Sequence, residues 1–189
     1  MLIVDLLRHT SGLTYGFQQR SNVDAAYREN KIGEVVKAGT LQSMIEDLAK
    51  IPLEFSPGEA WNYSVPTDVI GYLVGLISGK PFEQFLKERI FDPLGMNDTD
   101  FFVPADKAHR FAACYSADPQ GGMTFHAIER KGTLTLQDDP TKSSFLSPPS
   151  LISGGGGLCL DCVGLSHLLP RAAQRRRAWR RPAARSEDA

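Results

Sequence analysis

The chain has 189 residues, 42% of them apolar, which predicts one globular domain or part of a larger one. Its formal net charge of -1 hides an uneven distribution, because residues 171–189 carry seven of the 21 basic residues but only two of the 22 acidic ones. No apolar run is long enough for a membrane span, and three cysteines are too few for a disulfide framework.

Two helices are predicted in the first half of the chain. The first spans residues 41–50, with Thr40 as its N-cap, because apolar side chains recur on one helical face. The second has Ser64 as its N-cap and Pro66 in its first turn, and Gly79 ends it. Its long apolar stripe makes it the clearest helix of the sequence.

A third helix and three short strands follow. The helix begins at Pro81 and is expected to stop at Asp92-Pro93, because a proline disfavours helical backbone in the residue before it. Short apolar runs separated by turn residues predict strands at residues 111–115, 123–128 and 133–136. The first two strands are expected to form a small hairpin.

Four motifs indicate a class of protein. They are Asp5-Leu-Leu-Arg-His-Thr-Ser-Gly-Leu13, Phe55-Ser-Pro-Gly-Glu-Ala-Trp-Asn-Tyr-Ser64, Phe91-Asp-Pro-Leu-Gly-Met96 and Ser153-Gly-Gly-Gly-Gly-Leu158. Over residues 1–158 the chain resembles the serine hydrolases related to class C β-lactamases, penicillin-binding proteins and their esterase cousins. The resemblance implies an α+β, β-lactamase-like fold, present here mainly as its helical region and a small β-hairpin, with the central antiparallel sheet largely missing.

The resemblance implies that Tyr63 has a catalytic role. In such enzymes a serine attacks an acyl carbon, a lysine three residues later activates it, and a tyrosine on a separate loop carries the proton. Tyr63 matches that tyrosine by its place after Pro57-Gly58 and before a helix, and Trp61, Asn62 and Ser64 are expected to bind substrate. A tyrosine in this role needs cationic neighbours that lower the pKa of its phenol. The alternative is a tyrosine that only packs at a helix start.

Several departures from the family pattern bear on activity. Lactam-hydrolysing members have Tyr-x-Asn where this chain has Tyr63-Ser64-Val65, which favours the esterase-like branch. No serine is followed three positions later by a lysine, no Gly-x-Ser-x-Gly motif occurs, and Ser11 lies in a motif expected to shape a turn. Lys131-Gly132-Thr133 has the residues of a Lys-Thr-Gly motif in the wrong order and predicts a hairpin turn. We therefore expect a chain that starts downstream of its catalytic serine.

Residues 159–189 are expected to be an out-of-frame, disordered, Arg-rich tail. Permitted codons for residues 159–166, read one base later, give Val-Ser-Thr-Ala-Trp-Asp-Tyr, which is the family continuation. Dense like charge and low apolar content also disfavour packing. Cys159 and Cys162 are then neither a zinc site nor a redox pair, since a structural zinc needs four ligands. No metal, organic cofactor, membrane or nucleic-acid partner is expected.

The sequence leaves three hypotheses open. The first is a truncated and frame-shifted serine hydrolase, inactive alone, whose full-length relatives act on a small-molecule ester or amide. The second is a non-catalytic binding module whose basic tail holds a polyanion. The third is complementation by a separate chain that brings the serine and lysine. Met1–Val4 meet Asp5 too soon to be a signal peptide, so a cytoplasmic location is the default.

Overall fold

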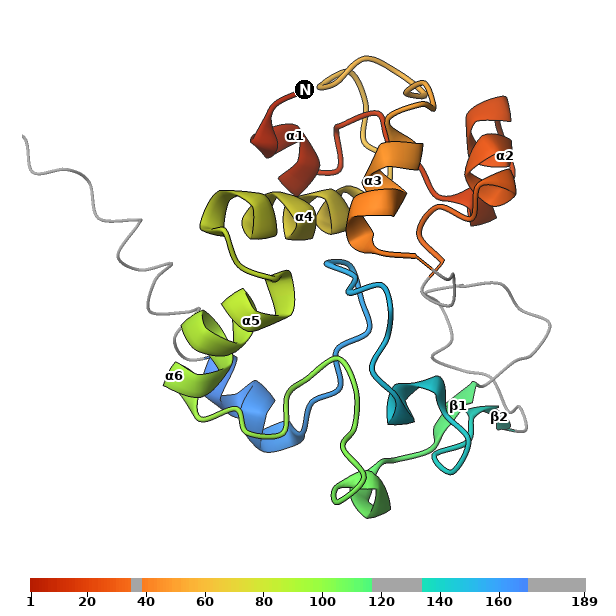
Figure 1. The fold of residues 1–189 in the computed structure, drawn as a ribbon. Helices are drawn as coiled ribbons and strands as arrows, with labels where there is room; N and C mark the ends of the chain where they lie inside the picture. The colour runs from red at the N-terminus through yellow and green to blue at the C-terminus, as the bar shows by residue number, and fades with distance from the viewer. Residues whose placement is uncertain (35–38, 117–133, 170–189) are drawn as a thin grey trace, which may run out of the picture.

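The computed structural model describes residues 1–34, 39–116 and 134–169, and helices dominate these ranges (Figure 1). Helix α4 crosses the body, with α1 above it, α3 beside one end, and α5 and α6 below. The α-helices are α1 Ile3–Leu7, α2 Asn22–Glu29, α3 Leu41–Leu48, α4 Pro66–Ser78, α5 Phe82–Leu86 and α6 Asp92–Leu94. Shorter turns of helix are η1 Gly16–Gln18, the π-helix η2 Lys87–Phe91, η3 Ala108–Arg110 and η4 Ser144–Leu146.

The described residues contain a single two-stranded sheet. Strands β1 Cys114–Ser116 and β2 Thr135–Asp138 pair antiparallel, with Tyr115 opposite Leu136. These strands overlap the first and third of the predicted strands. The predicted strand at 123–128, and with it the expected hairpin, lies outside the described residues.

The first two predicted helices form with one correction. Thr40 caps α3, because its hydroxyl accepts a hydrogen bond from the backbone N–H of Ser43 at 3.2 Å. Helix α4 has Pro66 in its first turn and ends at Gly79, whose φ of 66° is left-handed. The prediction of Ser64 as N-cap was wrong. The cap is Val65, because the Ser64 hydroxyl is already engaged, donating to the Asn62 carbonyl at 2.9 Å.

The third helix continues past its predicted stop. Helix α5 runs without a break into η2 and α6, and only Gly95, with a φ of 66°, ends it. Asp92 keeps helical backbone although a proline follows. The wide π-turn before Pro93 explains the error, because a proline has no N–H to give to a regular helical ladder and a π-turn interrupts that ladder.

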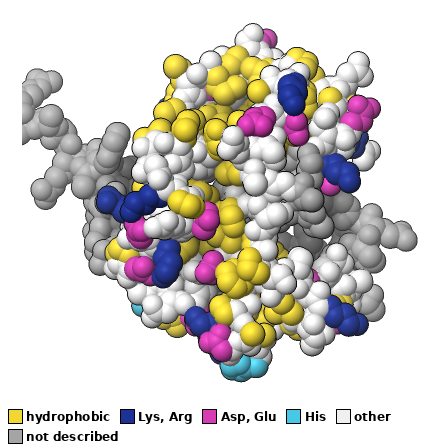
Figure 2. All heavy atoms as spheres, in the orientation of Figure 1, with side chains coloured by type: hydrophobic (Ala, Val, Ile, Leu, Met, Phe, Trp, Pro, Cys, Tyr) yellow, Lys and Arg dark blue, Asp and Glu magenta, His cyan; other side chains and the backbone are white. Residues whose placement is uncertain are grey.

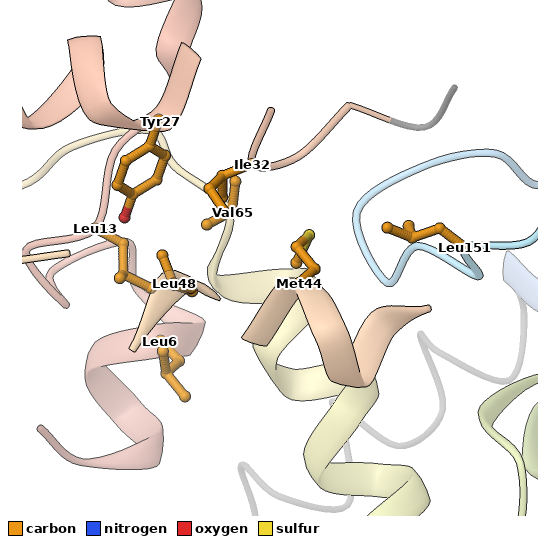
Figure 3. Packing of buried hydrophobic residues seen from close by; sticks show 8 residues of the cluster. All are labelled: Leu6, Leu13, Tyr27, Ile32, Met44, Leu48, Val65 and Leu151. Carbon is orange, nitrogen blue, oxygen red and sulfur yellow. The ribbon is translucent and has the colours of Figure 1, made fainter. Parts of the chain in front are cut away.

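The core lies between α2, α3, the start of α4 and the N-terminal segment (Figure 3). Tyr27 of α2 is its largest fully buried side chain, and burial raises the pKa of its phenol to about 12. The eight core residues are Leu6, Leu13, Tyr27, Ile32, Met44, Leu48, Val65 and Leu151. Leu151 enters from the C-terminal part of the chain, so residues far apart in the sequence share one core.

The face formed by α1 and α4 is markedly apolar. Leu2 at the N-cap of α1, Ile3 and Leu7 on α1, and Leu76 and Ile77 on α4 are each more than half exposed. Figure 2 shows hydrophobic side chains gathered over the upper part of the molecule, where α1 lies. None of the helices in the described ranges has the length and apolarity needed to cross a membrane. This α1–α4 face therefore meets water with side chains that favour association.

We expect the chain to self-associate through the α1–α4 face. Ile77→Lys places a charge where the side chain is 77% exposed, and it also suits the C-terminal end of a helix. Sedimentation equilibrium should show a concentration-dependent mass for the wild type and a lower one for Ile77→Lys. Leu136→Lys on β2 is the control and should behave as the wild type does. A wild type that stays monomeric would contradict this expectation.

Candidate functional site

Two motifs that are about 50 residues apart in the sequence lie side by side in the structure. The N–H of Asn62 donates to the His9 carbonyl at 2.8 Å, and the N–H of Gly58 donates to the Thr10 carbonyl at 2.7 Å. A third bond joins the N–H of Glu54 to the carbonyl of Gly12 at 2.8 Å. The loop that carries Tyr63 is therefore held against the His-Thr-Ser-Gly-Leu segment by main-chain bonds.

Asn62 joins this loop to neighbouring segments through side-chain hydrogen bonds. Its side chain is buried, and its Nδ2 donates to the Leu13 carbonyl and to Glu54 Oε2, both at 2.9 Å. Its Oδ1 accepts from Arg20 Nη2 at 2.6 Å and from Gln18 Nε2 at 3.0 Å. All four hydrogen-bonding positions of the amide are thus used within the chain.

Ser64 is equally enclosed. It is 1% exposed, and its N–H points to Nδ1 of His9 at 3.4 Å. His9 itself has a φ of 57°, a left-handed backbone that few residues other than glycine adopt and that recurs at functional sites. Because Asn62 and Ser64 face inward, their expected role in binding substrate stays a prediction.

Tyr63 and Trp61 point the other way, towards solvent. Tyr63 is 44% exposed and Trp61 is 67% exposed. The Tyr63 ring lies between those of His9 and Tyr15, with centroid distances of 5.1 and 5.3 Å. Within the described ranges no lysine or arginine forms a hydrogen bond or ion pair with the Tyr63 hydroxyl. The cationic neighbour that the expected chemistry needs is therefore not supplied by these residues.

Tyr15 is the buried partner of Tyr63. Burial raises the pKa of the Tyr15 phenol well above its usual range, and the negative charge of Asp68 and the neighbouring Tyr63 raise it further. A phenol with a raised pKa keeps its proton at neutral pH. Tyr15 therefore remains a neutral hydrogen-bonding group beside Tyr63 and does not act as a base.

The glycine-rich motif reaches the same place through Asp68. This carboxylate, in the first turn of α4, is buried and accepts from the Ser153 hydroxyl at 2.5 Å and from the N–H of Gly155 at 3.3 Å. Its position near a helix N-terminus suits a negative charge. The 153–157 turn is thereby fastened to the helix that follows Tyr63.

The turn approaches α4 so closely that only glycine fits. A Cβ on Gly154 would lie 2.1 Å from the carbonyl oxygen of Thr67, and one on Gly155 would lie 2.8 Å from Oγ1 of Thr67. The Tyr15 hydroxyl would be 3.6 Å from that second Cβ. This close approach of two backbones brings the glycine run beside the tyrosine pair.

The other candidates from the sequence lie elsewhere. Ser11 is fully buried and its hydroxyl accepts from the N–H of Leu13 at 3.4 Å, which is a turn contact. Residues 131–133 lie outside the described ranges. Cys159 pairs with Asp100 in an isolated β-bridge, and residues 162–169 form a helix. The out-of-frame origin expected for residues 159–189 is a property of the DNA, and it stays a prediction.

No group of three or more metal-binding side chains comes together in the part of the chain that the structure describes. Two cavities of about 200 Å³ lie away from the tyrosine pair, one beside η3 and one beside η4. Neither is lined by Tyr63, Trp61, Asn62 or Ser64. The exposure of Tyr63 and Trp61 instead places the candidate site on an open face.

The tyrosine loop, the His-Thr-Ser-Gly-Leu segment and the glycine turn meet at one place, and these are three of the motifs by which the chain resembles serine hydrolases of the β-lactamase and penicillin-binding-protein class. Comparison with known families agrees with this class. Residues 1–185 match the family model described as Beta-lactamase, and the chain belongs to this family. The match extends beyond residue 158, where the resemblance read from the motifs ended.

Known relatives include esterases. The chain is 35% identical over 158 residues to an uncharacterised protein of Mycobacterium tuberculosis, covering 84% of this chain and 35% of that protein. It is 31% identical over 134 residues to lovastatin esterase of Penicillium rubens, covering 70% of this chain and 32% of the esterase. The chain thus spans about a third of the length of these relatives.

A solved structure shows the same fold. EstCE1, described as a hydrolase with promiscuous acyltransferase activity, superposes with a TM-score of 0.67 at 26% identity, over 89% of this chain and 44% of that one. The predicted fold class is confirmed, and the described residues show its helical region with one small antiparallel sheet.

Removing the Asn62 amide should destabilise the fold. Asn62→Ala leaves the Leu13 carbonyl without its buried donor and removes the acceptor that Arg20 and Gln18 share, so we expect the free energy of unfolding to fall by about 2 to 3 kcal/mol. Urea denaturation followed by circular dichroism measures it. Trp61→Ala, one residue away on the exposed side, should change stability by less than about 0.5 kcal/mol. Equal effects of the two variants would contradict the assignment.

Proposed function

We propose that the protein is a serine-hydrolase component that transfers an acyl group from a small ester or amide to water, with Tyr63 as the proton carrier. The observation that carries this proposal is the half-exposed Tyr63 on a loop locked between the His9 segment and α4. Family membership supports the reaction class. Catalysis of this kind needs no metal or organic cofactor.

The geometry suits a proton carrier whose position is fixed and whose side chain reaches solvent. Main-chain bonds and the Asn62 amide hold the backbone on both sides of Tyr63, while its side chain is 44% exposed and its hydroxyl lies beside that of the half-buried Tyr15. In the proposed reaction the Tyr63 oxygen accepts the proton of an attacking serine while the hydroxyl's own proton passes to the leaving group, so the phenol is regenerated. A serine oxygen has to lie about 2.6–3.2 Å from it for that step.

Esters are the proposed substrates rather than lactams. In lactam-hydrolysing members an asparagine two residues after the tyrosine offers an amide to the substrate. Here that position is Val65, which is completely buried and packs in the core. An apolar side chain turned into the core offers no hydrogen bond to an amide substrate, which supports the esterase-like branch. Lovastatin esterase among the relatives points in the same direction.

The 189-residue chain alone is proposed to be inactive. It contains no serine with a lysine three residues later, and Ser11 is buried in a turn. We infer that the nucleophile and its lysine belong to sequence outside these 189 residues, in the same gene or in a complementing chain. A one-base shift near codon 159 remains part of this proposal. No described residue favours the alternative of a polyanion-binding module.

The purified chain should therefore not turn over p-nitrophenyl acetate or nitrocefin above the buffer rate. The physical reason is that the chain has no activated serine whose proton Tyr63 could accept. Absorbance assays at several protein concentrations measure this, with Tyr63→Phe as the comparison. Turnover by the wild type that Tyr63→Phe abolishes would overturn the inactivity but support the role of Tyr63.

Sequencing the DNA on both sides of codons 1–189 tests the rest. If an upstream Ser-x-x-Lys is found, the extended protein should hydrolyse p-nitrophenyl butyrate, and Tyr63→Phe should lower kcat by about 10²- to 10⁴-fold. Tyr115→Phe removes an equivalent hydroxyl from β1 and should leave kcat unchanged. Equal rates for Tyr63→Phe and the wild type would refute the assigned role.

A further inference from the structure

Tyr63 is the middle ring of a row of five. Phe17 stacks on Tyr15 with ring centroids 4.9 Å apart, and Tyr15 contacts Tyr63 at 5.3 Å. On the other side Tyr63 contacts His9 at 5.1 Å, and His9 contacts Trp61 at 6.1 Å. Each spacing lies in the range at which aromatic rings attract one another. We call these five residues the ring row.

The ring row is most exposed at its ends and centre. Trp61 is 67% exposed, Phe17 57% and Tyr63 44%, whereas His9 and Tyr15 are half-buried between them. Aromatic side chains in contact with this much water are costly to leave uncovered. The alternation places a large apolar surface on either side of the Tyr63 hydroxyl.

The ring row is held rigid by polar contacts beneath it. Phe17 lies in η1, whose Gly16 carbonyl accepts from Arg28 Nη1 at 2.5 Å. Gln18, the next residue, donates through Nε2 to the carbonyl of Tyr63 at 2.5 Å. The segment that carries Phe17 is thereby joined to the loop that carries Tyr63. Rings that are fixed before a ligand arrives lose little entropy when it binds.

The exposed area fits a small molecule better than a protein. A large aromatic side chain covers about 150–250 Å², so three rings exposed by about half present roughly 225–375 Å². A stable protein interface needs about 800 Å² from each partner. The row also contains no lysine, arginine or carboxylate side chain. A neutral small molecule with flat or apolar groups matches both properties.

We propose that the ring row recognises substrates that carry an apolar or aromatic group on each side of the carbonyl. One group stacks on Phe17 and Tyr15, the other stacks on Trp61 and His9, and the carbonyl lies over Tyr63. This inference rests on the proposed function for the place of the carbonyl. It adds the substrate class and a binding role for Phe17 and Tyr15.

Binding without reaction tests the inference separately from the proposed function. Butyranilide, a stable amide with a phenyl group on one side and a propyl chain on the other, is the probe, and acetamide is the polar control. Saturation-transfer and chemical-shift NMR on the full chain should show butyranilide, but not acetamide, at the ring row. Because no bond breaks, the result does not depend on a nucleophile.

Substitutions at the two ends of the ring row test the two proposed stacking contacts. Trp61→Ala and Phe17→Ala should each weaken butyranilide binding by about three- to tenfold, as expected for the loss of one stacked ring. Trp61→Phe should keep most of the affinity. Ile77→Ala removes an apolar group of similar exposure on α4 and should bind as the wild type does. Phe17→Leu replaces Phe17→Ala if the latter does not fold by circular dichroism.

Three outcomes would overturn the inference. The first is a Phe17→Ala variant that binds butyranilide as tightly as the wild type, which would remove the stacking contact at that end of the ring row. The second is tetramethylammonium displacing butyranilide at equal concentration, which would make the row a cation site. The third is a dimer that Trp61→Ala dissociates, which would make the row an interface between copies. Failure of ester hydrolysis alongside intact butyranilide binding would count only against the proposed reaction.

Discussion

The buried amide of Asn62 is the contact on which the candidate site depends. It joins the carbonyl of Leu13 to Glu54 and collects Arg20 and Gln18 from a third segment. A side-chain amide has two donor hydrogens and a carbonyl oxygen, so it can satisfy several buried groups at once. Without it, the loop before α4 would meet the His-Thr-Ser-Gly-Leu segment only through main-chain bonds and the long contact from the Ser64 N–H to Nδ1 of His9. The side chain therefore decides where the neighbouring Tyr63 ring stands.

Asp68 performs the corresponding task in the first turn of α4. Its buried carboxylate holds the Ser153 hydroxyl and the N–H of Gly155, which fastens a turn 85 residues away to the first turn of the helix. The glycines are needed because any side chain at residue 154 would collide with the Thr67 carbonyl. Two buried polar side chains thus assemble a site from three separate segments. Their hydrogen bonds are strong because water is excluded from them.

Local patterns predicted the local structure well where one signal dominated. The Thr40 cap, the proline in the first turn of α4 and the closing Gly79 all act within a few residues, so they can be recognised in the sequence. Helix α2 was not predicted, although Ser21 caps it and Asp24 completes the capping box, because its eight residues include too few large apolar side chains to mark one helical face. Predictions failed where a distant or competing contact decided, as when the hydroxyl of Ser64 turned to the Asn62 carbonyl.

The sequence by itself determined the family, because its motifs are contiguous and their residue types are specific. It also singled out Tyr63 and showed that no Ser-x-x-Lys pair is present. Only the tertiary structure decided which side chains of the motif face water, since Trp61 and Tyr63 alternate with the buried Asn62 and Ser64. The ring row was likewise invisible in the sequence. Its members come from segments about 50 residues apart, and contacts between such segments depend on how the chain packs rather than on local spacing.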